Sequence, residues 1–211
     1  ILLWTLLTEQ THAIWTAHLL DTSTKTFMDL VHPQTGLVYT NDWLARRVAS
    51  VGLENGSEGI SFRNGSQLDF RARSGRRGRG LTAATAVVDE ALFWTQEQAG
   101  ALLPVLATKS RFGNARAYYA SSAAKKESDI LRTFRARAES KDATLIHVGF
   151  WAPGSWAEPG CQAPDCQHEL SAIGCSLDNE ELWLVANPLL GSGVSYAFMR
   201  TMRRTMSPLV F

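Results

Sequence analysis

A short apolar run that ends in two adjacent carboxylates constrains this chain more than any other feature. The run occupies residues 83–88, is partly β-branched, and is followed directly by Asp89 and Glu90. Such a run is typical of a buried strand of a parallel sheet. In open α/β sheets, ligands bind just beyond the carboxyl ends of the strands. The two acids are therefore expected at the ligand-binding edge of a sheet.

Two interpretations of this acidic pair are open from the stretch alone. In the first, residues 83–94 form a Walker B element, in which Asp89 holds the magnesium ion of a nucleoside triphosphate and Glu90 orients and deprotonates the attacking water. In the second, a core strand is followed by a solvated helix start, because acidic side chains favour a helix N-terminus. The neighbouring motifs have to decide between them.

The composition indicates an ordinary globular domain without a global attraction to nucleic acid. The chain has 211 residues, of which 45% are hydrophobic and 19% are charged, and its net charge is +1. The apolar N-terminal segment is interrupted by Glu9, Thr11 and His12 and has no basic flank, which argues against a signal peptide and a membrane span. Because the sequence starts with Ile1, inside an expected helix, we expect it to be a fragment.

Positive charge is concentrated in and before one glycine-rich loop. Five arginines fall within nine positions, namely Arg71, Arg73, Arg76, Arg77 and Arg79. A solvated loop is one interpretation of this segment, and a contact with phosphate or nucleic acid is the other.

The remaining pattern alternates expected strands and helices. Strands are predicted at residues 12–16, 115–120 and 144–151, and a hairpin at 60–70 is expected to turn through Asn64-Gly65, the preferred type I′ pair. Helices are predicted at residues 1–8, 21–31, 42–50, 96–106, 125–139, 180–186 and 196–206. The first of these is expected to be buried, and the third is expected to turn Trp43 inward. This alternation predicts an α/β fold with a mostly parallel sheet flanked by helices.

Several short motifs, in this order and spacing, resemble those of the large terminase subunit of tailed bacteriophages, the motor that packages DNA into capsids. The resemblance covers most of the chain. The motifs are Trp15-Thr-Ala-His18, Phe62-Arg-Asn-Gly-Ser66, Phe70-Arg-Ala-Arg-Ser74, Gly78-Arg-Gly80, Val87-Val-Asp-Glu-Ala91, Tyr119-Ala-Ser-Ser-Ala123 and Ala186-Asn-Pro188.

The resemblance implies a RecA-like P-loop NTPase fold of the ASCE type that hydrolyses ATP with Mg²⁺. It implies that Asp89 and Glu90 are the Walker B pair, with Asp89 on the magnesium ion. It also implies that Ser121 and Ser122 form the coupling motif at the bound nucleotide, and that Arg79 acts on the nucleotide of a neighbouring subunit. The implied partners are double-stranded DNA, a small terminase subunit, a portal protein and a homo-oligomeric ring on the capsid. The implied location is the cytoplasm of the infected bacterial host, transiently on the procapsid, with no membrane.

Two departures from the family pattern shape the expected domain organisation. No G-x-x-x-x-G-K-[ST] sequence, the Walker A loop that cradles phosphates, occurs in the chain. The C-terminal nuclease domain of the family is absent as well. We therefore expect residues 1–151 to be an ATPase domain without its Walker A loop, truncated at both ends, and the fragment alone to be inactive. Residues 152–193 are expected to be a Cys/Pro/Gly-rich insertion and linker, and 194–211 a helix leading toward the nuclease domain.

Two other functions remain as alternatives. A superfamily 2-type helicase or translocase core shares the Asp-Glu pair, but such helicases usually continue it with Ala/Cys-His or Ala-Asp, whereas Ala91 is followed by Leu92 and Phe93 here. A non-catalytic nucleic-acid-binding module would use the arginine loop. A Gly-Lys-Ser/Thr sequence directly upstream would support the motors.

A cluster of soft ligands raises a separate question. Cys161, Cys166, His168 and Cys175 could bind a structural zinc ion tetrahedrally, although their spacing is not a standard one. The alternative is three reduced cysteines in a variable surface insertion.

Overall fold

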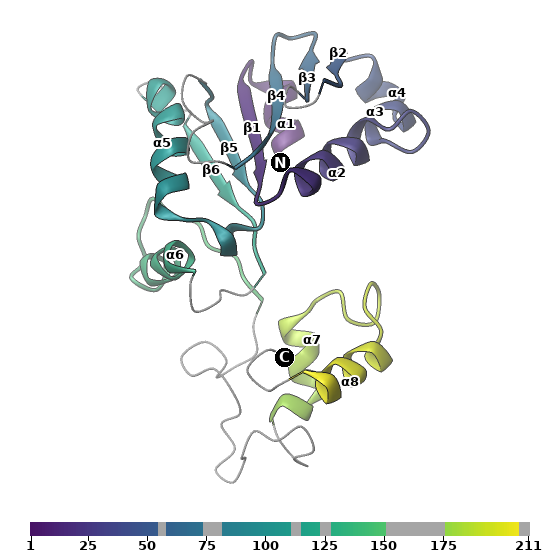
Figure 1. Cartoon of the computed structure of the whole chain (residues 1–211), viewed down its shortest axis with the longest axis vertical. Coiled ribbons are helices and arrows are strands. Elements are labelled where there is room, and N and C mark those ends of the chain that lie inside the picture. Colours follow the sequence, from purple (N-terminus) through teal and green to yellow (C-terminus); the bar gives the residue numbers. More distant parts are fainter. Residues whose placement is uncertain (55–57, 74–81, 111–114, 123–127, 151–175, 207–211) are drawn as a thin grey trace. The chain divides into compact units, whose positions relative to one another are not determined.

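The computed structural model describes residues 1–54, 58–73, 82–110, 115–122, 128–150 and 176–206. The chain divides into two compact units, Ile1–Leu145 and Ile146–Phe211, and each is described by itself. Figure 1 shows the helices and strands of both units along the chain.

The first unit is built on a six-stranded sheet with the order β2-β3-β4-β1-β5-β6. Strands β4, β1, β5 and β6 are parallel neighbours, and β2 and β3 extend the sheet in antiparallel fashion beside β4. The strands are β1 (His12–Ala17), β2 (Val48–Gly52), β3 (Gly59–Phe62), β4 (Gln67–Ala72), β5 (Thr85–Val88) and β6 (Arg116–Tyr119). The helices are α1 (Leu2–Thr8), α2 (Leu20–Val31), α3 (Leu37–Thr40), α4 (Asp42–Ala45), α5 (Gln96–Ser110) and α6 (Asp129–Glu139), with a 3₁₀ turn η1 (Ala91–Phe93).

Two apolar cores cover the two faces of this sheet. Successive residues of a strand point to opposite faces, so Ile14 of β1 joins the core under α5 and α6 while Ala13 joins the core under α1 and α2. All four residues of β5 are buried, as the apolar run before Asp89 predicts. Burying a large apolar side chain such as Phe27 or Leu68 contributes about 1.5–3 kcal/mol. The sheet is therefore a rigid support for whatever follows its strand ends.

The hairpin between β3 and β4 forms as predicted, but its turn is not the expected type I′. Gly65 N donates to Phe62 O at 3.0 Å and Phe62 N to Ser66 O at 2.9 Å, which closes a three-residue loop. Within it Gly65 has a φ of 86° and Asn64 keeps a negative φ, whereas type I′ needs positive φ at both central residues. The Asn64 side chain instead donates from Nδ2 to Leu6 O at 2.8 Å, and so fastens the turn to the end of α1.

Three local predictions are wrong, and strand pairing explains the first two. The helix expected at 42–50 ends with Ala45, because Val48 and Val51 pair with β3 in strand β2; Trp43 is 55% exposed instead of turned inward. The helix expected to be buried at 1–8 leaves Trp4 71% exposed.

The strand expected at 144–151 does not form in the described residues. Residues 145–150 have no regular secondary structure, and the side chain of Ile146 is almost fully exposed. Strand β6 ends the sheet in the part of the chain that the structure describes, so this stretch pairs with no strand there. Without a partner strand, local β propensity alone does not stabilise extended structure.

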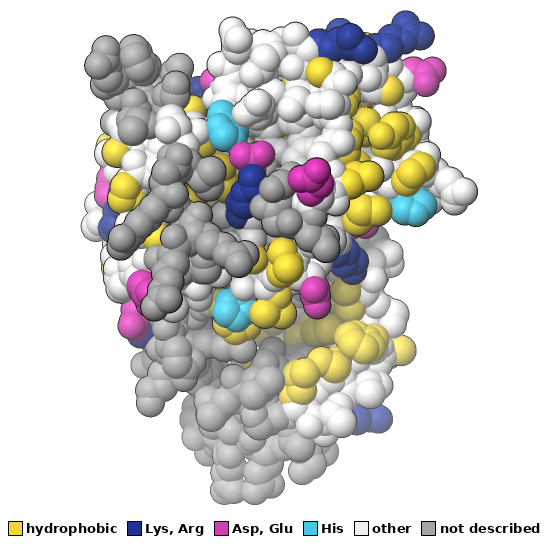
Figure 2. Space-filling model, turned by 45° about the horizontal axis from the view of Figure 1, so that its top comes forward, with side chains coloured by type: hydrophobic (Ala, Val, Ile, Leu, Met, Phe, Trp, Pro, Cys, Tyr) yellow, Lys and Arg dark blue, Asp and Glu magenta, His cyan; other side chains and the backbone are white. Residues whose placement is uncertain are grey.

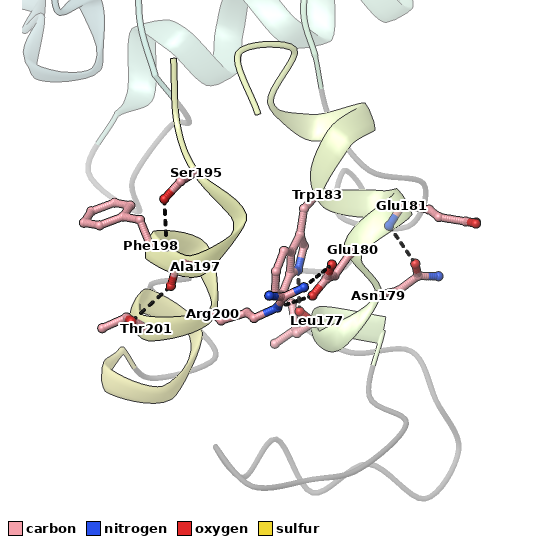
Figure 3. Close-up of polar contacts among 10 residues, drawn as sticks. All are labelled: Leu177, Asn179, Glu180, Glu181, Trp183, Ser195, Ala197, Phe198, Arg200 and Thr201. Atoms are coloured by element: carbon pink, nitrogen blue, oxygen red, sulfur yellow. Dashed lines mark hydrogen bonds and ion pairs between the residues drawn. The ribbon is translucent and has the colours of Figure 1, made fainter. Parts of the chain in front are cut away.

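The second unit has a 3₁₀ turn η2 (Ser176–Asp178) and two helices, α7 (Glu180–Ala186) and α8 (Tyr196–Thr205). Asn179 caps α7 and Ser195 caps α8 through side-chain oxygens that accept from Glu181 N and Phe198 N (Figure 3). Arg200 of α8 donates two hydrogen bonds to the Glu180 carboxylate, at 2.6 and 2.9 Å (Figure 3). This bidentate pair joins α8 to α7, and the buried Arg203, whose Nε lies 3.0 Å from Asp178 Oδ1, joins α8 to η2.

Candidate functional site

The acidic pair lies where the sequence places it, directly beyond the carboxyl end of β5. Asp89 N donates to Thr16 O at 2.8 Å, which continues the pairing of β5 with β1 by one residue. Asp89 Oδ1 then accepts from Glu90 N at 2.9 Å. Glu90 itself has a left-handed backbone, with φ 50° and ψ 48°. That conformation costs a non-glycine residue on the order of 1 kcal/mol and is common where a site dictates the backbone.

Arg73, to which the sequence pattern gave no individual role, reaches the same place. Arg73 follows β4, and its Nη2 donates to the main-chain oxygen of Glu90 at 3.2 Å. In the sheet β1 lies between β4 and β5, so the side chain crosses the end of a whole strand. Burial lowers the pKa of Arg73, and the nearby carboxylates of Glu90 and Asp89 oppose that shift.

Strands β1, β4 and β5 are each followed by a residue with buried polar atoms that have no hydrogen-bond partner among the described residues. These atoms are Nδ1 of His18 after β1, Nε and Nη1 of Arg73 after β4, and Oε2 of Glu90 after β5. Buried polar groups in folded proteins are nearly always hydrogen-bonded, so unsatisfied ones at one sheet edge indicate a ligand-binding role. A guanidinium with two such N–H groups suits a phosphate, and a carboxylate suits a magnesium ion.

The segment after β1 contributes an ordered ring to this edge. His18 stacks on Phe93 of η1, with the ring centroids 4.6 Å apart. Thr16 Oγ1 donates to Val87 O at 3.3 Å and ties β1 to β5 just before the acids. The residues at 16–18 thus contact the turn formed by Asp89 and Glu90, which we call the acidic turn, from the neighbouring strand.

The two serines predicted to couple to the nucleotide follow the next strand along the sheet. Ala120 N donates to Val88 O at 3.0 Å, and Ala91 N donates to Ala120 O at 2.9 Å. These bonds hold the end of β6 against the acidic turn, so Ser121 and Ser122 emerge beside it, and both are exposed.

The other predicted site residues lie outside the described residues. They are Arg79 and the possible zinc ligands Cys161, Cys166, His168 and Cys175. Among the described residues, no group of three or more His, Cys, Asp or Glu side chains is arranged to hold a metal ion. A single magnesium-binding carboxylate, as predicted for Asp89, needs no such group because nucleotide-bound Mg²⁺ keeps waters and phosphate oxygens as ligands.

One signal could have directed attention to Arg73. It stands three residues beyond the predicted hairpin at 60–70 and one residue beyond strand β4, as Asp89 stands one residue beyond β5. The sequence pattern does not reveal that β4 pairs in parallel with β1. This pairing brings the end of β4, before Arg73, to the same edge of the sheet as the end of β5, before Asp89.

The sheet order and the flanking helices match the fold of terminase ATPase domains, which is a P-loop NTPase fold. The chain matches the crystal structure of the HK97 bacteriophage large terminase over 92% of its length, with a TM-score of 0.69 and 18% sequence identity. Both the predicted fold class and the predicted resemblance to large terminases are confirmed at the level of the fold. The chain spans 35% of that HK97 protein.

Two further solved structures share less with the chain. One is the large terminase of a thermophilic bacteriophage, with a TM-score of 0.47, 12% identity and coverage of 71% of this chain and 35% of that one. The other is the same terminase in complex with ADP, with a TM-score of 0.37, 11% identity and coverage of 56% and 28%. No family profile and no curated protein matches the chain. Within the described residues, no helix is both long and apolar enough to cross a membrane.

Proposed function

We propose that this chain is part of the ATPase domain of a bacteriophage DNA-packaging motor. The observation that carries the proposal is the convergence of Arg73, Asp89 and Glu90 at one sheet edge, with buried polar atoms that lack partners among the described residues. The fold match to the HK97 large terminase supports a packaging motor rather than a helicase core.

Magnesium-bound ATP would supply the bond between its β- and γ-phosphates that is broken. The residues of this chain would position a water molecule against the γ-phosphate and activate it. Asp89 would hold the magnesium ion through its carboxylate. Glu90 would accept the proton of the attacking water, because its Oε2 is buried and has no partner among the described residues. Arg73 would act as a positioning residue, since its hydrogen bond to the Glu90 carbonyl fixes the left-handed backbone that aims the carboxylate.

Ser121 and Ser122 would sense the bound phosphates beside this turn. Arg79 would act on the nucleotide of a neighbouring subunit. The proposal extends to double-stranded DNA, a small terminase subunit, a portal protein and a homo-oligomeric ring on the procapsid as partners, in the cytoplasm of the infected host. It also keeps the expected division into an ATPase domain at 1–151, an insertion and linker at 152–193 and a connecting helix at 194–211.

The decisive experiment is an ATPase assay of the motor that carries these residues together with a phosphate-binding loop. Glu90→Gln keeps the shape and removes the base, so hydrolysis should fall by about 10²-fold or more while ATP binding survives. Asp89→Ala should instead weaken the binding of magnesium-ATP.

Glu97→Gln is the matched control, because Glu97 is an exposed acid in the first turn of α5, just after the acidic turn, and loses the same charge. It should leave turnover unchanged. Wild-type turnover by Glu90→Gln would refute the assignment of Glu90 as the base.

A further inference from the structure

A group of exposed arginines lies at the end of the sheet opposite the acidic turn. Arg46 and Arg47 precede β2, and Arg63 lies in the hairpin loop that precedes β4. Arg63 N donates to Arg47 O at 2.8 Å, so the two segments are joined through their main chains. Figure 2 shows Lys and Arg side chains gathered at the upper edge of the molecule, with apolar side chains close by. We name Arg46, Arg47 and Arg63 the arginine edge.

One of these side chains is held in place by an aromatic ring. The guanidinium carbon of Arg47 lies 3.7 Å from the ring centroid of Trp43, and Arg47 Nη1 donates to Trp43 O at 2.8 Å. Trp43 is 55% exposed, although the sequence pattern predicted that it would face the core. A large aromatic ring left in solvent to order a guanidinium reduces the entropy that this group loses when it binds an anion.

The arginine edge is not neutralised by the part of the protein that the structure describes. None of its guanidinium groups forms an ion pair there, in contrast to Arg116, Arg132, Arg137 and Arg200. Asp42, in the first turn of α4, is the acid nearest to it in sequence, so the segment from Asp42 to Arg47 together with Arg63 keeps a net positive charge.

Guanidinium groups pair with phosphate in a planar, bidentate manner and are less strongly hydrated than ammonium groups. A nucleic-acid backbone presents a closely spaced series of phosphates, so neighbouring guanidinium groups can each find one. An acidic protein surface offers carboxylates without that regular spacing.

We propose that the arginine edge, with Trp43 as the platform for Arg47, binds the sugar–phosphate backbone of DNA. This surface lies at the other end of the sheet from the acidic turn. The choice of DNA as the nucleic acid rests on the proposed packaging function, whereas the recognition of a polyphosphate backbone rests on the geometry alone.

The test is binding of a fluorescently labelled duplex to the purified chain without nucleotide, measured by anisotropy across a salt series. The double variant Arg46→Gln/Arg63→Gln should bind about tenfold more weakly at low salt. The slope of log affinity against log salt should fall by about 0.9 for each phosphate that the variant no longer neutralises. The matched control is Arg132→Gln/Arg204→Gln, which removes two charges from exposed arginines elsewhere and should leave the slope unchanged.

A thermodynamic cycle tests the role of the ring. Trp43→Ala should weaken binding when Arg47 is present and have no effect when Arg47 is replaced by Gln. Equal affinity and equal salt slope for the arginine-edge variant and the control would overturn the proposal.

Two other outcomes would assign the surface to a protein partner and also overturn it. In the first, labelled polyglutamate binds to the arginine edge, and DNA of the same total charge does not displace it. The other is self-association by light scattering that only the arginine-edge variant loses. Because no nucleotide is present, failure of the ATPase assignment at Glu90 would leave this result unaffected.

Discussion

Arg73 and Glu90 are joined by a hydrogen bond from a guanidinium to a main-chain oxygen, 3.2 Å long, that spans the end of the strand between them. The bond fixes the carbonyl of a residue whose backbone is left-handed, and it leaves two other nitrogens of the same guanidinium buried without partners among the described residues. We expect such an arrangement to lower the stability of the fold and to position the Glu90 carboxylate, and the first two predictions test both effects.

The first prediction separates stability from activity at Arg73. Arg73→Met keeps the length of the side chain and removes the unpaired buried N–H groups, so the melting temperature of the chain should stay the same or rise. Hydrolysis by the complete motor should fall by about 10²-fold because the Glu90 carboxylate is no longer held in place. Arg71→Met is the control: Arg71 lies on β4, two residues before Arg73 and with its Nη2 3.7 Å from Asp69 Oδ2, and its removal should leave turnover unchanged. A lowered kcat in both variants would remove the special role of Arg73.

The second prediction concerns the backbone of Glu90. Glu90 and Lys141 are the two non-glycine residues with positive φ in the described chain, at 50° and 57°. Glycine adopts this conformation without strain, so Glu90→Gly and Lys141→Gly should each stabilise the fold, by up to about 1 kcal/mol in thermal or urea unfolding. Only Glu90→Gly should abolish hydrolysis. If Glu90→Gly destabilises the chain while Lys141→Gly does not, the backbone at Glu90 is not strained.

The third prediction concerns Arg79, which lies outside the described residues. Arg79→Ala and Glu90→Gln motors should each be inactive, and an arginine that acts across a subunit interface can be supplied by a neighbour. Mixed rings should therefore regain part of the hydrolysis, since an arginine of this kind contributes about 10³–10⁵ in rate. If confirmed mixed assemblies stay inactive and Arg79→Ala mainly changes the salt slope of DNA binding, the loop contacts DNA instead.

The fourth prediction concerns the cysteine cluster, which is also outside the described residues. If Cys161, Cys166, His168 and Cys175 hold a structural zinc ion, protein purified without added metal should contain close to one equivalent of zinc by elemental analysis. Cys166→Ser should lose that metal. A folded protein free of zinc would leave three reduced cysteines as the correct interpretation.

The fifth prediction uses the ion pair that joins α7 to α8. The hydrogen bond from Arg200 holds the pKa of Glu180 below its ordinary value, so the pair stabilises the folded state above that ordinary value and stops doing so as pH falls through the lowered one. Glu180→Gln should therefore weaken amide protection in α7 and α8 by hydrogen exchange at pH 7, and the difference from the wild type should shrink in acid. Glu181→Gln, one residue on, should have no such effect, and an equal effect of both variants would contradict the assignment.

The local sequence determined those helices and strands whose hydrophobic pattern and turn residues agree over the whole length of the element. The apolar run before Asp89 is a buried strand, and the alternation around Asn64-Gly65 is a hairpin, because burial of one face and turn chemistry act within a few residues. The position of Asp89 and Glu90 beyond a strand end follows from the same pattern.

Tertiary structure decided everything that depends on which strand lies beside which. The pairing of β4 with β1 is set by contacts between residues more than fifty positions apart, and no local pattern encodes it. Together with the pairing of β1 with β5, it brings Arg73 to Glu90. Likewise, residues 46–50 favour a helix locally, yet Val48 and Val51 gain more by pairing with β3, which ends α4 early and leaves Trp43 in solvent beneath Arg47. Asp89 and Glu90 were predicted from the sequence, whereas their convergence with Arg73 was not, because it arises from long-range strand pairing rather than from local propensity.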